Sequence, residues 1–246
     1  MRKVLLGVSA LILSMTTFAD NKFGIGIGTG YSNSIYKGAD NKTYPMPLMD
    51  IDYGKLYIKG ATVGYTVYQD DVFAASLFLN PLGGFAVDGE DLASGYDGID
   101  DRDFQSMFGI RVDAKTGVYG IRTGLSAQGG KEGSEFKLSA FKPIYVNDKL
   151  VVVPSIHLKG YTKQFTDYYF GVTSEEANRS SSINSSYDAD AGYSFGVNLS
   201  AEYSLTDNIA LMSFLGIEKF SSEISDSPIV ESDVLFLMGV GAKYYF

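Results

Sequence analysis

The chain has 246 residues, a formal net charge of −9, 45% hydrophobic residues and no cysteine. Such an acidic chain is a poor partner for nucleic acid, and without cysteine it forms neither disulfides nor thiolate metal sites. No apolar run is long enough to cross a bilayer as a helix, which excludes a helical membrane protein.

The N-terminus has the pattern of a secretory signal peptide. Arg2 and Lys3 precede an apolar stretch over residues 4–13, and small residues follow up to Ala19. A basic n-region, a short apolar h-region and a small-residue cleavage site define such a peptide. We therefore expect residues 1–19 to be removed between Ala19 and Asp20, leaving residues 20–246 as one exported domain. Without Arg2 and Lys3, its 18 basic and 29 acidic residues leave a charge of −11.

Apolar and polar residues alternate along most of the remaining chain. Successive side chains of a strand point to opposite faces, so this alternation predicts strands with one apolar face. At the start of the first strand, every second residue from Gly24 to Gly30 is glycine, which leaves part of one wall open to bulky groups from other strands. The predicted strands are 22–32, 44–53, 55–60, 61–69, 72–82, 104–114, 117–127, 134–146, 149–163, 190–204, 208–220 and 233–246.

The connections between these strands are alternately short and long. Tight turns at 115–117, 147–148 and 206–208 contrast with polar segments at 83–103, 163–189 and 221–232. Short periplasmic turns, long external loops and aromatic girdles are typical of outer-membrane barrels, and 18 Tyr and 16 Phe can supply such girdles. We predict an antiparallel transmembrane β-barrel of twelve strands in the outer membrane of a Gram-negative bacterium.

Two details of this barrel stay open in the sequence. The pair 55–60 and 61–69 is short, and ten strands remain if it does not form. In the segment 134–146 the apolar face changes phase near Ala140 and Phe141, where we expect a β-bulge. The last strand, 233–246, alternates without interruption and ends in the aromatic Phe246, which resembles the assembly signal of outer-membrane barrels.

Several short motifs occur in an order and spacing that point to one family. The first group is Tyr36-Lys37-Gly38-Ala39-Asp40 and Tyr44-Pro45-Met46-Pro47; the second is Tyr168-Tyr169-Phe170-Gly171-Val172, Glu175-Glu176-Ala177 and Tyr187-Asp188-Ala189; the third is Ser227-Pro228-Ile229-Val230. Through these motifs the chain resembles the MipA/OmpV family of outer-membrane proteins. The acidic segment 88–103 has no clear counterpart in the family pattern.

The resemblance implies a non-enzymatic role in the cell envelope. Family members are described as scaffolds that link murein hydrolases to murein synthases, and others as adhesins or osmotically responsive proteins. No catalytic residues belong to the family pattern, so the resemblance implies neither catalytic residues nor a cofactor. Outer-membrane lipid and lipopolysaccharide are the expected surroundings, and murein enzymes are the implied periplasmic partners.

The only histidine, His157, offers the one route to catalysis that the residues suggest. Ser155 lies two residues before it on the same strand face. Residues so placed are about 7 Å apart at the backbone, and a nucleophile and its base need a direct hydrogen bond and an orienting third group. We therefore expect His157 to make a hydrogen bond inside the barrel, and we predict no enzyme activity.

Charged residues of both signs fall on the faces predicted to line the interior. A wide lining of one sign is typical of an ion-selective pore, whereas mixed signs pair across a narrow barrel and close it. A closed, salt-bridged interior is therefore the favoured interpretation, with a narrow channel for small solutes as the alternative. The predicted set is Arg111, Asp113, Arg122, Glu135, Lys137, His157, Lys159 and Glu202.

The long loops support a further alternative, surface adhesion. The segment 163–189 carries several tyrosines, and 88–103 carries seven carboxylates against the lone Arg102. The acidic segment does not have the order of an EF-hand loop, so we predict a solvated acidic loop and no metal site. Divalent cations that bridge this segment to lipopolysaccharide phosphates are the weaker hypothesis.

Overall fold

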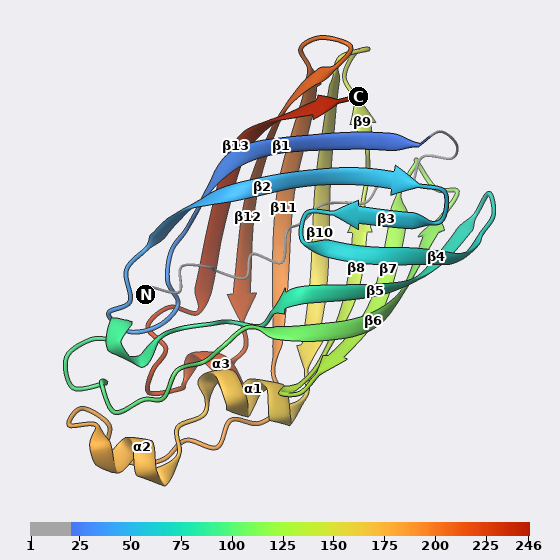
Figure 1. Cartoon of the computed structure of the whole chain (residues 1–246). Helices are drawn as coiled ribbons and strands as arrows, with labels where there is room; N and C mark the ends of the chain where they lie inside the picture. The colour runs from blue at the N-terminus through green and yellow to red at the C-terminus, as the bar shows by residue number, and fades with distance from the viewer. Residues whose placement is uncertain (1–20) are drawn as a thin grey trace.

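The computed structural model describes residues 21–246, which form a closed antiparallel β-barrel with the long loops gathered at one end (Figure 1). Strands that are consecutive in the sequence pair with one another, and the pairing of the first strand, β1, with the last, β13, closes the ring. The predicted cleavage site at Ala19 and Asp20 lies outside the described residues. The strands are β1 (Lys22–Ser32), β2 (Lys42–Tyr53), β3 (Leu56–Lys59), β4 (Thr62–Gln69), β5 (Phe73–Gly83), β6 (Gln105–Lys115), β7 (Arg122–Gly130), β8 (Gly133–Phe141), β9 (Ile144–Tyr145), β10 (Leu150–Tyr161), β11 (Tyr193–Ser204), β12 (Ile209–Phe220) and β13 (Val234–Tyr245).

These segments make twelve strands of the barrel, which confirms the predicted number. β8 and β9 form a single strand, because both pair with β10 in one register, with Phe141 opposite Ser155 and Ile144 opposite Val152. Pro143 interrupts the ladder between them, since proline has no N–H to donate. The bulge predicted near Ala140 is wrong: the register shifts lie between Thr66 and Tyr68 in β4 and between Asn80 and Gly83 in β5.

The outer face of the barrel is apolar and the inner face is polar or small. Ile27 and Phe108, for example, point outward and are more than 70% exposed, whereas Asn198 and Lys159 are buried inside. Lipid can surround the outer side chains, while the inner polar groups find hydrogen-bond partners across the barrel. Glycines in β1 make room for this packing: a Cβ at Gly30 would lie 2.6 Å from the ring of Tyr44.

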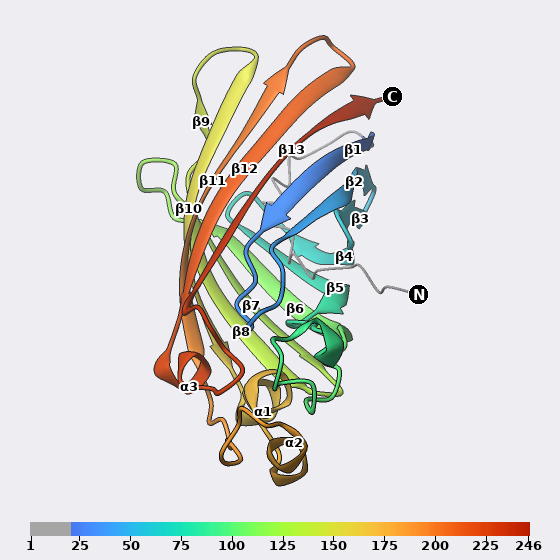
Figure 2. The same ribbon diagram turned by 90° about the vertical axis from the view of Figure 1, so that its left-hand side faces the viewer.

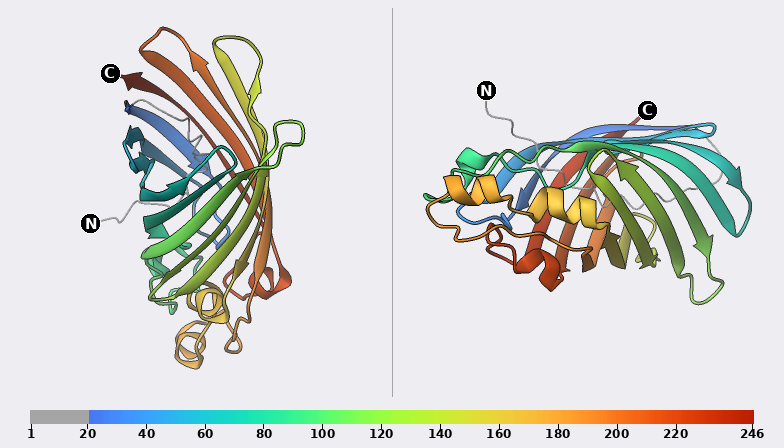
Figure 3. Two further views of the ribbon diagram at one scale, coloured as in Figure 1. Left: turned by 90° about the vertical axis from the view of Figure 1, so that its right-hand side faces the viewer. Right: turned by 90° about the horizontal axis from the view of Figure 1, so that it is seen from below.

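A compact cap of loops covers one end of the barrel (Figures 2 and 3). It consists of residues 33–41, 84–104, 162–192 and 221–233 and contains η1 (Gly89–Asp91), α1 (Lys163–Phe170), α2 (Ser174–Arg179) and α3 (Ser222–Ser225). None of the helices in residues 21–246 is long and apolar enough to cross a membrane. The end with the cap is called the capped end below, and the opposite end, with the short turns and the C-terminus, the turn end.

The cap has its own hydrophobic core. Phe165, Tyr169 and Phe170 of α1 are fully buried, and Phe85 packs against Tyr169 and Phe170 with ring centroids 6.1 and 5.3 Å apart. Burial of such aromatic side chains stabilises the cap through the hydrophobic effect. The core members are Ile35, Tyr36, Val87, Leu92, Ile99, Met107, Tyr161, Phe165, Tyr169, Phe170, Val172, Ala177, Ile183, Phe220, Ile224, Ile229 and Val230.

Candidate functional site

Two of the predicted interior residues meet at a carboxylate that the sequence analysis did not include. His157 Nε2 lies 3.4 Å from Glu218 Oε2, and Lys159 Nζ lies 3.0 Å from the same carboxylate. Ser194 Oγ, at 2.6 Å, and Tyr161 OH, at 3.2 Å, complete the surroundings of Glu218. We call these five residues the Glu218 cluster. It lies inside the barrel on β10, β11 and β12.

A second cluster surrounds Asp50, on β2, nearer the turn end. The Asp50 carboxylate lies 3.0 Å from Lys22 Nζ, 2.5 Å from Lys59 Nζ and 3.1 Å from Lys243 Nζ. Tyr245 OH donates a hydrogen bond to it over 2.8 Å. Glu202, the one predicted member, joins through Lys243 at 2.6 Å. This Asp50 cluster connects β13 to β1, β2 and β3.

The remaining predicted residues occupy separate places along the inner wall. Arg111 and Asp113 form an ion pair at 2.7 Å within β6, and Glu135 accepts a hydrogen bond from Gln128. Lys137 lies directly opposite Lys159 in the β8–β10 ladder. Like charges directly opposite each other repel. The nearby carboxylates of Glu218 and Glu135 offset the repulsion between these two lysines. Arg122 is half-buried at the turn end of β7.

Apolar neighbours explain why the sequence analysis missed Glu218 and Asp50. In β12 the inward positions include Met212, Phe214 and Phe220 as well as Glu218, so that strand does not alternate clearly. In β2, Leu48 shares the inward face with Asp50. The sequence signal for each of these two residues was a single charged residue at an inward position among apolar residues.

The arrangement around His157 is not that of a nucleophile and its base. Ser155 Oγ has no hydrogen-bond partner within residues 21–246, and the His157 ring contacts Asn198 and Glu218 instead. The described part of the chain also contains no group of three or more histidine or acidic residues that could hold a metal ion. His157 is therefore part of a hydrogen-bond network inside the barrel.

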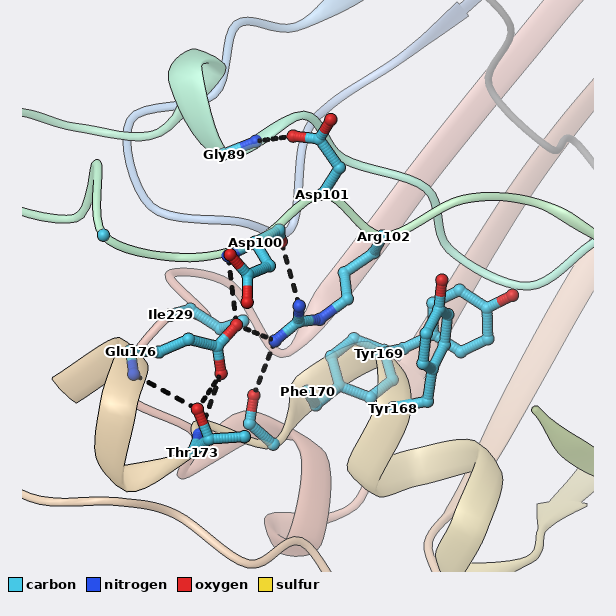
Figure 4. Close-up of polar contacts among 12 residues, drawn as sticks. Gly89, Asp100, Asp101, Arg102, Tyr168, Tyr169, Phe170, Thr173, Glu176 and Ile229 are labelled. Carbon is cyan, nitrogen blue, oxygen red and sulfur yellow. Dashed lines mark hydrogen bonds and ion pairs between the residues drawn. The ribbon is translucent and has the colours of Figure 1, made fainter. Parts of the chain in front are cut away.

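A buried ion pair holds the cap together (Figure 4). Arg102 NH2 lies 2.7 Å from Glu176 Oε1, and both side chains are less than 10% exposed. Arg102 also donates hydrogen bonds to the carbonyl oxygens of Asp100 and Gly171, at 2.9 and 3.2 Å. The guanidinium thus joins the loop before β6 to the segment between α1 and α2.

Glu176 caps the start of α2 in addition to its ion pair with Arg102. Thr173 Oγ1 accepts the Glu176 N–H, and the Glu176 carboxylate accepts the Thr173 N–H, which together form a capping box. Burial favours a raised pKa for the Glu176 carboxyl, but hydrogen bonds from the Thr173 and Asp100 amides and from Arg102 outweigh it and hold the pKa below its ordinary value.

The cap is therefore expected to loosen in acid. A carboxyl with a lowered pKa in the folded state adds stability above its unfolded pKa, about 4.3. That stability is lost as the pH falls through the lower folded pKa. Hydrogen exchange over residues 163–180, corrected for intrinsic rates, should show reduced protection at pH 3 relative to pH 6. Glu176→Gln should show a smaller difference, and an equal difference would assign the effect to other carboxylates.

The acidic segment 88–103 is packed against the cap by its apolar residues. Leu92 and Ile99 are buried, and the Val87–Arg102 bridge joins the two ends of the segment. Six of its seven carboxylates are at the exposed positions Glu90, Asp91, Asp97, Asp100, Asp101 and Asp103. These side chains are solvated, as predicted, whereas the backbone of the segment is an ordered part of the cap.

The turn end carries an exposed aromatic residue in an unfavourable backbone conformation. Tyr119, in the turn between β6 and β7, has φ of +49° and is 84% exposed, and Val118 beside it is 53% exposed. A bulky residue at positive φ costs about 1–3 kcal/mol, and such strain clusters at functional sites. The turn places two apolar side chains at the edge of the barrel.

Comparison with known proteins places the chain among outer-membrane proteins. The family model described as "MltA-interacting protein MipA" matches residues 25–246. A 24 kDa outer membrane protein of Pasteurella multocida is 31% identical over 232 residues, covering 90% of this chain and 89% of that protein. The MltA-interacting protein of Escherichia coli K12 is 26% identical over 245 residues, 98% of this chain and 97% of that protein. Among solved structures, the NanC porin matches with a TM-score of 0.48 and 7% identity, over 89% of this chain and 98% of that chain.

Proposed function

Because this chain belongs to the MltA-interacting protein (MipA) family and is an outer-membrane barrel, we propose that it is a non-enzymatic interaction protein of the cell envelope. Its partners are murein-remodelling enzymes bound at the turn end, which faces the periplasm in this proposal. The name of the Escherichia coli relative supports a partner of the MltA type.

The closed cap is the observation that carries this proposal. Four loops pack into one hydrophobic core over the capped end, and the charges of the Glu218 and Asp50 clusters are paired inside. A selective channel needs a continuous aqueous path with polar sites along it, and the cap opposes such a path. The function is therefore assigned to the surface of the barrel rather than to transport through it.

The cap also argues against adhesion through the tyrosines of residues 163–189. Tyr169 is fully buried in the hydrophobic core of the cap, and Tyr168 and Tyr187 pack against that core. Side chains that stabilise the cap are not available to bind a host surface. At the turn end, by contrast, Val118 and Tyr119 are exposed and offer an apolar anchor.

Replacing Val118 and Tyr119 is expected to weaken capture of the partner. Truncation of a well-packed aromatic anchor costs about 2 kcal/mol or more of binding free energy, which corresponds to roughly a thirty-fold rise in Kd. The full-length barrel in detergent is immobilised, and binding of a purified MltA homologue is measured for the wild type and for Val118→Ser with Tyr119→Ser.

The matched control changes the turn between β11 and β12 at the same end. Leu205→Ser also removes an exposed apolar side chain, but this side chain is outside the 116–121 turn. The proposal requires normal binding by Leu205→Ser and weak binding by the 118/119 variant. Equal binding by all three proteins, each still heat-modifiable, would contradict this assignment of the partner site, and no binding by the wild type would contradict the proposed function.

A further inference from the structure

The barrel wall is incomplete between β2 and β5 in its capped half. β3 has only four residues, and its pairing with β2 stops at Asp50 opposite Lys59. The β4–β5 ladder starts at Val63 opposite Leu79. Residues 42–48 of β2 and 80–83 of β5 therefore face one another beyond the tip of the β3–β4 hairpin without a strand between them (Figure 1). We call this part of the wall the wall opening.

Two prolines of β2 occupy positions that would direct N–H groups into the wall opening. Backbone groups of alternate residues point to the same neighbouring strand. Met49 accepts the Gly60 N–H at 2.8 Å, so the odd-numbered residues of β2 are directed toward the β3 side. Two of them are Pro45 and Pro47, and on β5 Pro81 lies within the register shift between Asn80 and Gly83 and likewise has no N–H.

This proline pattern fits a permanent opening rather than a site for another strand. An unpaired N–H in the hydrocarbon region costs several kcal/mol, and open sheet edges are otherwise absent from membranes. Proline removes that donor and also prevents the addition of a partner strand, which needs it. A wall closed by hydrogen bonds must break them to open, whereas here only side chains have to move.

A small cavity lies at the base of the cap, next to the wall opening. It measures about 50 Å³ and is lined mainly by cap residues of 33–40 and 84–87, with Ser32, Lys42, Leu235 and Leu237 from the adjoining strand ends. Ser32 contributes a hydroxyl that is 2% exposed and has no hydrogen-bond partner within residues 21–246. The lining is mostly apolar but also includes Asn33, Ser34, Asp40 and Lys42, and the Ser32 hydroxyl is its buried polar group without a partner in residues 21–246.

A groove on the lipid-facing side reaches the edge of the wall opening. It measures about 620 Å³ and is lined mainly by outward apolar residues of β4–β8, among them Phe108 and Phe136. The groove includes Val63 and Leu79, which form the last pair of the β4–β5 ladder before the wall opening. Apolar molecules dissolved in the membrane can therefore lie against the barrel up to the edge of the wall opening.

We propose that the wall opening is a lateral passage through which a small lipid-soluble molecule, with one hydroxyl or carbonyl group, enters the cavity beside Ser32 from the membrane. In this proposal the ligand arrives through the lipid and not from the water above the cap. The passage is independent of the partner site proposed at the turn end.

The absence of cysteine from the chain allows a direct test. Ser32→Cys places a thiol in the cavity, and Ser155→Cys places one inside the barrel at a position that has a strand partner on each side, Phe141 and Asn198. The two serines are a matched pair, because both are buried and both hydroxyls lack a partner in the described chain. Leu199→Cys, on the lipid-facing side, shows that the reagent is present in the bilayer. Each full-length variant is refolded into phosphatidylcholine vesicles and checked for heat-modifiability.

Two reagents then distinguish the routes. With pyrene maleimide dissolved in the bilayer, Ser32→Cys should react at least ten times faster than Ser155→Cys. A sulfonated methanethiosulfonate added to the water should leave both thiols unmodified. Equal slow reaction of the two variants with the maleimide would overturn the proposal, because side chains would then seal the wall opening. Rapid reaction of Ser32→Cys with the charged reagent would also overturn it, because the route would then be aqueous.

Discussion

Arg102→Ala is expected to open the cap while the barrel remains folded. The guanidinium joins Glu176 to two backbone carbonyl groups in a buried place, so its removal leaves the Glu176 carboxylate without its counter-ion. Breaking such a pair from one side costs about 3–5 kcal/mol. Because the barrel has its own hydrogen-bonded ladder, this loss should fall on the cap alone. Chymotrypsin should then cut at Tyr168–Phe170, where Tyr169 and Phe170 are fully buried in the wild type.

Arg179→Ala is the matched control. Arg179 lies in the same cap and pairs with Asp100 at 2.7 Å, but both side chains are about half exposed or more. Exposed pairs contribute little, so this variant should resist chymotrypsin as the wild type does. In a planar bilayer the wild type should be electrically silent, and Arg102→Ala should show discrete openings. Unchanged chymotrypsin resistance of Arg102→Ala would show that the ion pair does not hold the cap.

Asp50→Ala is expected to destabilise the whole barrel. The Asp50 carboxylate contacts three lysines and accepts a hydrogen bond from the Tyr245 hydroxyl. Its loss leaves the three lysine cations close together at a partly buried site. The cost is again about 3–5 kcal/mol, the amount typical when one partner is removed from a buried ion pair. Since the cluster joins β13 to β1, β2 and β3, the seam between the two ends of the chain weakens first. Gel mobility after stepwise heating should show unfolding at a clearly lower temperature.

The control for Asp50 is an ion pair of the same chemistry at the surface. Asp233 pairs with Lys219 at 3.1 Å, and these side chains are 45% and 68% exposed. Asp233→Ala should unfold at nearly the wild-type temperature. Asp50→Asn should fall between the two, because the amide still accepts hydrogen bonds but carries no charge. Equal unfolding temperatures for Asp50→Ala and Asp233→Ala would show that the Asp50 cluster does not stabilise the barrel.

The strands of this barrel were predictable because one physical condition governs all of them. Lipid on one side and a polar interior on the other require alternation, and even the short pair that forms β3 and β4 followed it. The exception is Phe141, which points inward near the turn end and imitates a change of phase. The sequence showed the apolar residue but not that the interior accepts it there.

The interior clusters and the cap could be predicted less well, for different reasons. Ion pairing across a barrel depends on which strands become neighbours, so Glu218 could not be matched to His157 before the register was known. The cap depends on contacts between loops far apart in the chain, and its segments look like polar loops because their buried residues do not alternate. Several motifs of the family resemblance, including Tyr169, Phe170 and Ile229, belong to the core of this cap.

The cap also orders the events of folding. Its four segments are separated by nearly the whole chain, and the Tyr36–Val230 bridge joins the loop after the first strand to the loop before the last. Contacts of such long sequence separation form late, and this bridge needs β1 and β13 side by side. A chain that has not yet inserted its last strand therefore cannot complete the cap around its aromatic residues. Protection of those residues from protease is accordingly a signature of finished assembly, one that separates mature barrels from stalled intermediates.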